Sequence, residues 1–237
     1  KEAFANLGEM CAQGWGVPRD FNEAAEWFRR GADAGEPRAQ FNLARLHVMG
    51  TGVRVDLDKA RRLLQEAARA QPQEPRYRNW LGSVYYDLGD YDSAVEMLRS
   101  AGTQGAEPAR AWDYYLGMAL LKAEKFEEAR EALLRAAAEP VEHNRGLDRR
   151  KEAGEELSRL ERHLEHRRKA ARFLSVRELG GAKDELAAAM AILASREAKA
   201  ELAAIEESLA ARKAKRGGLA AAGLGAASVS VAGAIFL

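Results

Sequence analysis

The sequence GWGV at residues 14–17 recurs as GTGV at residues 50–53, a shift of 36 positions. An aspartate follows each copy at the same distance, Asp20 in the first and Asp56 in the second. Glycines supply the positive φ angles that a tight turn needs, and Pro18 hinders continuation of any helix that precedes it. The pattern predicts two copies of one unit, each with a tight turn between two helices.

A second pair of related segments follows, with a shift of 35 positions. Leu81-Gly82 corresponds to Leu116-Gly117. The further matches are Tyr91 with Phe126, Ala94 with Ala129, Leu98 with Leu133 and Ala101 with Ala136. A period of this length is typical of two-helix repeats, in which no unit buries its apolar face without a stacked neighbour.

Small residues are expected where the two helices of a unit cross. Gly82 and Ala94 are predicted at such a crossing, because larger side chains would push the helices apart. Tyr85 and Tyr91 are predicted to fill the space beside them. In the first unit, Asp20 is a predicted N-cap, since its side chain can accept backbone hydrogen bonds at the start of a helix.

These residues resemble two families of helical repeats. Residues 1–72 resemble two Sel1-like repeats, whose pattern is carried here by residues 50–53, Asp56 and Lys59-Ala60. Residues 73–140 resemble two tetratricopeptide repeats, which is carried by Leu81-Gly82, Tyr85, Gly89-Asp90-Tyr91, Ala94 and Ala101. The resemblance implies an all-α fold, a right-handed α-solenoid of helix-turn-helix repeats.

Residues 141–216 are predicted to form a charged helical hairpin that caps the array. Apolar residues at three- and four-residue spacing indicate two long helices, about 147–178 and 183–215, separated by Gly180-Gly181. His163 and His166 are expected to form a solvated pair rather than a metal site, because a closed site needs three or four ligands. The basic runs at 149–151 and 167–169 are likewise expected on solvated faces.

Residues 217–237 contain no charged side chain and follow the basic run at residues 212–216. The apolar stretch 219–237 is close to the length of about 20 residues that spans a bilayer. The sequence therefore predicts a C-terminal apolar helix that anchors the protein in a membrane, with the solenoid on the cytoplasmic side. The alternatives are a buried alanine-rich helix or a tail, and, with a signal peptide ahead of Lys1, a periplasmic or envelope location. Fractionation with protease protection of the full-length protein distinguishes these cases.

The composition argues against several classes of function. The 37 basic and 36 acidic residues give a net charge of +1, so no overall field indicates nucleic-acid binding. The single cysteine provides neither a disulfide framework nor a cysteine zinc cluster. No motif indicates an active site, and we expect no enzyme activity, cofactor, metal or small-molecule substrate.

The resemblance implies a partner-binding face lined by the first helix of each repeat. The predicted contact residues are Arg76, Asn79, Ser83 and Tyr86 in the third unit, and Tyr114, Met118 and Leu121 in the fourth. The expected function is a non-enzymatic adaptor that holds a protein or peptide partner on the concave face and is tethered to a membrane. The alternative is a structural component of a cell-envelope or secretion assembly that has no dedicated peptide groove.

Overall fold

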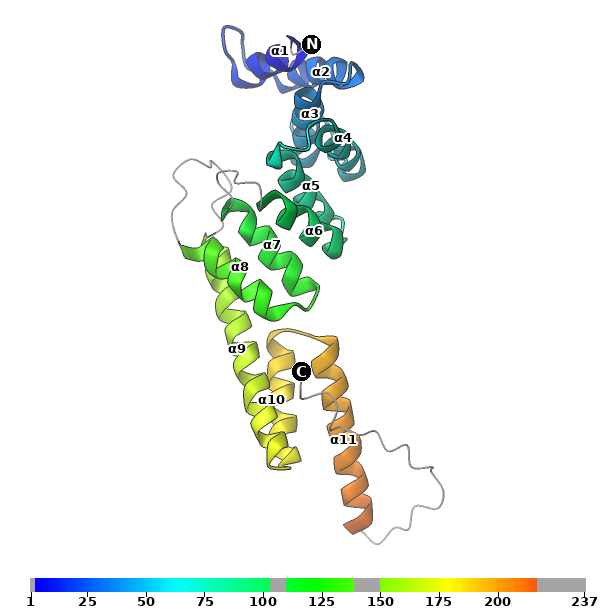
Figure 1. Cartoon of the computed structure of the whole chain (residues 1–237), viewed down its shortest axis with the longest axis vertical. Coiled ribbons are helices and arrows are strands. Elements are labelled where there is room, and N and C mark those ends of the chain that lie inside the picture. The colour runs from blue at the N-terminus through cyan, green and yellow to red at the C-terminus, as the bar shows by residue number, and fades with distance from the viewer. Residues whose placement is uncertain (1–2, 103–109, 139–149, 217–237) are drawn as a thin grey trace. The chain divides into compact units, whose positions relative to one another are not determined.

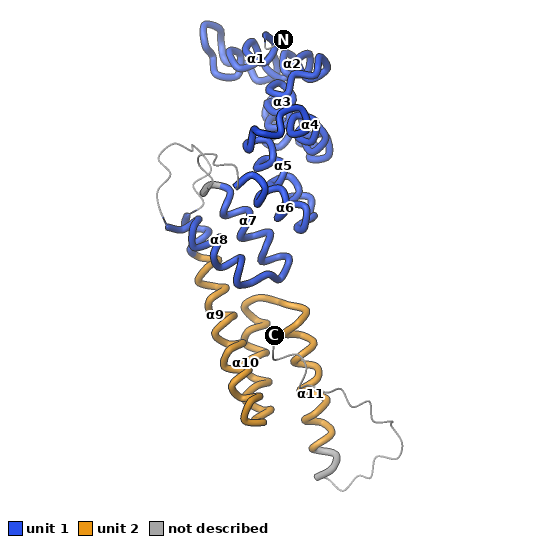
Figure 2. Tube along the Cα trace, in the orientation of Figure 1, with its two compact units in different colours: residues 1–154 blue, residues 155–237 orange. Residues whose placement is uncertain are grey.

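The computed structural model of the chain describes residues 3–102, 110–138 and 150–216, and these residues form α-helices and no β-strand. Figure 1 labels the helices in chain order. Their bounds are α1 (Ala3–Gln13), α2 (Phe21–Asp33), α3 (Pro37–Met49), α4 (Leu57–Ala70), α5 (Pro75–Asp87), α6 (Tyr91–Gly102), α7 (Arg110–Lys122), α8 (Phe126–Ala138), α9 (Arg150–Ser175), α10 (Leu179–Ile192) and α11 (Arg196–Arg216). The chain divides into two compact units, residues 1–154 and 155–237 (Figure 2).

The two predicted turns have the same geometry. Gly14, Gly16, Gly50 and Gly52 have φ angles of 75°, 74°, 67° and 71°, which non-glycine residues rarely adopt. Each turn is closed by the same backbone hydrogen bond, from Asp20 to the carbonyl oxygen of residue 11 and from Asp56 to that of residue 47, at 2.9 and 3.1 Å. The hydrogen bonds that close the two turns therefore repeat at the same 36-residue interval as the sequence.

The helix starts are fixed by capping side chains. The Asp20 carboxylate accepts hydrogen bonds from the backbone of residues 22 and 23, which confirms the predicted N-cap, and Asp56 accepts one from residue 59 at 2.8 Å. Pro37 and Pro75 are the first residues of α3 and α5, where proline is favoured, and a glutamate precedes each. The carboxylate of Glu36 also accepts a hydrogen bond from the backbone of residue 5 at 3.2 Å. The joint between α2 and α3, Glu36-Pro37, therefore contacts the start of the first repeat.

Glycine allows close helix crossing within the pairs, as predicted. A Cβ atom at Gly82 would lie 2.5 Å from Cγ of Leu98 and 3.3 Å from the carbonyl oxygen of Ala94. At Gly117 it would lie 2.7 Å from Cγ of Leu133. The third and fourth pairs, α5 with α6 and α7 with α8, therefore cross at corresponding positions.

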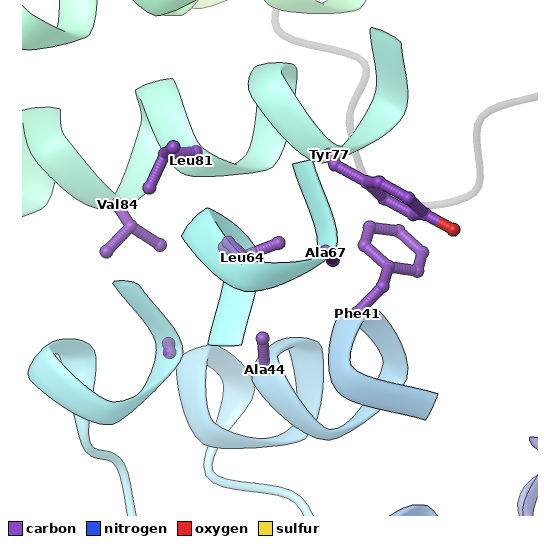
Figure 3. Close-up of a cluster of buried hydrophobic side chains, with 8 residues drawn as sticks. Phe41, Ala44, Leu64, Ala67, Tyr77, Leu81 and Val84 are labelled. Carbon is purple, nitrogen blue, oxygen red and sulfur yellow. The ribbon is translucent and has the colours of Figure 1, made fainter. Parts of the chain in front are cut away.

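Neighbouring pairs share one core. Figure 3 shows Leu64 and Ala67 of α4 among side chains from α3 and α5. The buried members of this cluster are Phe41, Ala44, Ala60, Leu64, Ala67, Tyr77, Leu81 and Val84. Three consecutive helices, from two different repeats, bury the cluster together, and this is the stacking that the repeat pattern predicts.

The second unit differs from the predicted hairpin. Its described residues form three helices, because the expected helix over residues 183–215 is interrupted at residues 193–195. The Ser195 hydroxyl accepts a hydrogen bond from the backbone of Ala198 at 3.0 Å, as an N-cap does, and α11 starts there. The prediction of two long helices is wrong, because the apolar spacing continues across a serine that starts a new helix.

His163 and Arg167 on α9 were expected on solvated faces and are not there. His163 is fully buried, and its Nδ1 lies 2.9 Å from the carbonyl oxygen of Ala189 on α10. Arg167 donates to Glu197 and Glu201 on α11 at 2.8 and 2.9 Å. Both side chains therefore join α9 to the other helices of its unit.

The burial of His163 predicts a pH dependence of stability for the second unit. Burial lowers the pKa of His163 below its ordinary 6.5, the hydrogen bond to Ala189 raises it, and Arg167 and His166 lower it further. Below about pH 6.5 the unfolded chain binds a proton that the folded unit resists, so stability is lost as the pH falls. Amide hydrogen exchange of α9, α10 and α11 should accelerate between about pH 7 and about pH 5, after correction for intrinsic exchange.

The matched variant for this experiment is His163→Gln, which keeps a hydrogen-bond donor for Ala189 and removes the titration. Its stability should change less with pH than that of the parent chain. An equal pH dependence in both proteins would show that other groups cause it.

None of the helices within the described residues combines the length and the apolar character that a bilayer crossing needs. The predicted anchor, residues 217–237, lies outside the described residues, so it stays a prediction from sequence.

Candidate partner-binding groove

The first helix of each repeat packs against the first helix of the next. Contacts join α1 to α3, α3 to α5 and α5 to α7, so these four helices form one layer of the first unit. A groove of about 390 Å³ lies in this layer. It is lined by Glu9 of α1, by Arg38, Phe41, Asn42 and Arg45 of α3, and by Arg76 and Tyr77 of α5, and we call it the arginine groove.

Glu9 is held in the groove by α3. Arg38 donates to Glu9 through Nε at 2.9 Å and also through Nη2, and Asn42 donates to the same carboxylate at 2.9 Å. Arg38 also donates to Asn6 at 3.1 Å. This network joins the first repeat to the second and satisfies the acidic side chain of the groove.

Arg45 lies against two aromatic rings. Its guanidinium carbon is 5.6 Å from the ring centroid of Phe41 and 5.4 Å from that of Trp80, within the range of cation–π attraction. Its Nη1 is 3.5 Å from Oδ1 of Asn42, and its Nε is buried without a hydrogen-bond partner. Burial lowers the pKa of Arg45 from its usual value, Glu9 raises it and Arg76 lowers it, and an arginine remains charged in every such case.

Arg76 lies at the rim of the groove, where its side chain is 62% exposed. It donates two hydrogen bonds of 2.9 Å to the carboxylate of Glu74. These hydrogen bonds lower the pKa of Glu74 more than its desolvation raises it. Arg76 therefore presents a partly neutralised guanidinium to the groove.

A smaller pocket of about 230 Å³ adjoins the arginine groove, and both share Glu9, Asn42 and Arg45 as lining residues. We call it the apolar pocket because most of its remaining lining is apolar. That lining includes Ala12, Trp15, Phe21, Phe28, Leu46 and Met49. Trp15 is 61% exposed and Met49 is also exposed, so large apolar side chains at this pocket face solvent.

The predicted contact residues of α5 have different environments. Arg76 lines the arginine groove. Asn79 and Ser83 are buried, and the Ser83 hydroxyl donates to the carbonyl oxygen of Trp80 at 2.8 Å. Neither of these two side chains is open to a partner in this structure, because both are enclosed by the packing of α5.

The predicted residues Tyr86, Tyr114, Met118 and Leu121 are half-buried. Tyr86 and Tyr114 both contact the ring of Tyr115, with centroid distances of 6.0 and 5.5 Å. Ring contacts continue from Tyr115 through Trp112 and Trp80 to Phe41. The tyrosines named from sequence are therefore joined to the arginine groove by a chain of aromatic contacts.

The lining residues Arg38, Phe41 and Arg45 were not predicted, although a signal for them exists. Leu43 of the second unit corresponds to Leu81 of the third, a shift of 38 positions. The same shift takes residues 76, 79 and 83 of the predicted face back to Arg38, Phe41 and Arg45. The register of the third and fourth units, extended to the second, therefore indicates three of the residues that line the groove.

The described residues contain no group of three or more histidine, cysteine, aspartate or glutamate side chains arranged to hold a metal ion. Cys11 is buried in the core of the first two repeats, and burial raises the pKa of its thiol. Among the described residues of the first unit, the arginine groove and the apolar pocket are two features that have the form of a binding site.

Comparison with known proteins agrees with the repeat pattern. The Sel1 repeat model matches residues 2–36 and 37–72. The model of anaphase-promoting complex, cyclosome, subunit 3 matches residues 56–136. No curated protein matches the chain at a significant level.

Several solved structures resemble the chain. A Sel1 repeat protein from Oxalobacter formigenes is 26% identical, with a TM-score of 0.45, and the match covers 65% of this chain and 72% of that one. A protective antigen present in uropathogenic Escherichia coli strains, which displays an SLR fold, is 21% identical, with a TM-score of 0.51 and coverages of 90% and 43%. The APC/C hetero-tetramer Cut9–Hcn1 is 17% identical, with a TM-score of 0.40 and coverages of 86% and 40%.

The chain thus spans less than half of the length of the last two proteins. The likeness to the Escherichia coli antigen supports the fold alone.

Proposed function

We propose, from the Sel1 repeat matches over residues 2–72 and the second repeat match over residues 56–136, that the chain is a non-enzymatic scaffold that binds a segment of a partner protein. The partner lies on the layer formed by α1, α3, α5 and α7. The observation that carries the proposal is the arginine groove together with the adjoining apolar pocket, because residues of α1 and α3, two helices of this layer, line both.

The physical reasons favour binding rather than catalysis. A stacked array holds its groove in a fixed shape, so a partner segment binds without a large ordering cost in the receptor. Three helices contribute to the groove, and none of its lining side chains is a histidine, cysteine or serine. Arginine and aromatic side chains are the residues most enriched among energetically dominant interface contacts.

Site-specific photo-crosslinking in the native cells tests this function. A benzophenone amino acid replaces Gln13, an exposed residue at the edge of the apolar pocket, and in a matched variant it replaces Arg62, an exposed residue of α4 outside both cavities. We expect a defined protein adduct from position 13 at a several-fold higher yield than from position 62. Equal yields at the two positions would contradict the proposal.

The predicted tyrosines are tested in the same assay. Tyr86→Ala combined with Tyr114→Ala should reduce the adduct at position 13 if the partner segment extends along the layer to α7. An unchanged yield would confine the partner to α1, α3 and α5. Thermal melting of the double variant verifies that the array remains folded.

A further inference from the structure

The arginine groove has more positive than negative charge. Its lining carries three arginines and one carboxylate, that of Glu9. Glu9 is paired with Arg38, and Arg76 is paired with Glu74 beside the groove. Arg45 forms no ion pair with any carboxylate in the part of the chain that the structure describes.

Arg45 is also held in place. The rings of Phe41 and Trp80 fix the guanidinium plane, so a ligand would not have to restrict a free side chain. Its Nε is buried and has no hydrogen-bond partner, so a ligand in the groove would meet the guanidinium through its terminal nitrogens. A carboxylate matches this donor geometry, because its two oxygens can accept parallel hydrogen bonds from one guanidinium.

The apolar pocket adds a second requirement. It begins at the same three residues, Glu9, Asn42 and Arg45, and continues toward Trp15 and Met49. A ligand that occupies both cavities therefore carries an anionic group and a bulky apolar group close together. In an extended peptide, side chains two positions apart lie on the same face and are separated by about 7 Å along the chain, which suits such a pair.

From these observations we infer that the partner segment is an extended acidic peptide, in which an aspartate or glutamate binds Arg45 and a bulky apolar residue two positions away enters the apolar pocket. The inference rests on the proposed function and names the chemistry of the partner. Charge complementarity with Arg45 is the argument for the acidic residue, and the exposed apolar lining is the argument for its neighbour.

The test is selection of a random-sequence peptide library on the immobilised full chain, followed by titration of the selected peptides by fluorescence anisotropy. We expect the selected peptides to be enriched in aspartate or glutamate two positions from leucine, isoleucine or phenylalanine. Arg45→Gln should weaken their binding about tenfold or more, because a charge-assisted hydrogen bond is lost. Arg45→Lys should retain part of the affinity, because it keeps the charge and loses the planar donor pair.

The matched control is Arg62→Gln, which removes the same charge from α4 outside the groove. It should leave the affinity unchanged, and thermal melting verifies that each variant is folded. Selected peptides without acidic residues, or equal binding by the parent chain and Arg45→Gln, would overturn the inference and leave the proposed function in place. Failure to select any peptide above a blank surface would also overturn it, while the crosslinking at position 13 decides the proposed function independently.

Discussion

Replacing Leu64 with alanine is expected to lower the free energy of unfolding of the repeat array by about 3 kcal/mol. Leu64 is fully buried at the centre of the cluster shared by α3, α4 and α5. The substitution removes apolar contacts and leaves a cavity, and both effects destabilise the folded state. Because the cluster joins two repeats, the loss also weakens the stacking of the second repeat on the third.

Urea unfolding followed by circular dichroism measures this change, and Leu134→Ala is the matched control. Leu134 lies on α8 with 40% of its surface exposed, so the same chemical change there should cost well under about 1 kcal/mol. Similar losses for the two variants would show that the cluster around Leu64 does not hold the repeats together.

Replacing Gly82 with valine is expected to cost about 3 kcal/mol, the upper end of the usual range for overpacking. Even the first added carbon would lie 2.5 Å from Leu98 and 3.3 Å from the backbone of Ala94, so α5 and α6 would have to separate. The two additional methyl groups of valine enlarge the clash. The partner side chain, Leu98, is buried and has little room to move.

The control for Gly82 is Gly102→Ala at the end of α6. No atom lies within 4 Å of a Cβ at Gly102, so alanine should be neutral there or stabilise the helix by up to about 1 kcal/mol. Urea unfolding of the two variants distinguishes a steric effect from a general effect of glycine removal. A Gly82→Val chain as stable as the parent would contradict the crossing geometry.

The repeat architecture could be predicted because its residues act locally. The glycines at positions 14 and 50 set the turns, Asp20 caps the helix that follows, and Gly82 marks a helix crossing. Each of these effects depends on a few neighbours in sequence or on one partner helix at a constant spacing. A period in the sequence is therefore enough to place them.

The second unit was harder to predict because its decisive contacts lie far apart in the sequence. Ser195 starts a helix in the middle of a stretch whose apolar spacing continues, so periodicity alone favoured one long helix. His163 and Arg167 stand among charged residues, and their partners on α10 and α11 are 26 to 34 residues away. The charged residues around them in the sequence favoured solvent-exposed positions for both, whereas both side chains contact other helices of the unit.

One residue of the predicted contact face, Arg76, lines the arginine groove, because the repeat register places it on the first helix of the third unit. Asn79 and Ser83 occupy the same register and are buried, since the next repeat covers a side chain to an extent that depends on the neighbouring helices. The environment of Arg45 is harder to predict from sequence, because its guanidinium lies against Phe41 on its own helix and against Trp80 on the next repeat.

The joints ahead of α3 and α5 carry the same dipeptide, Glu36-Pro37 and Glu74-Pro75, 38 residues apart. A gene duplication that copied residues 36–73 would insert a complete module with one such joint at each boundary. The new module would add another helix to the layer of α1, α3, α5 and α7 and leave the outer ends of the array unchanged. Under the proposed function, evolution can therefore adjust the length of the bound segment in whole modules, without redesigning the existing contacts.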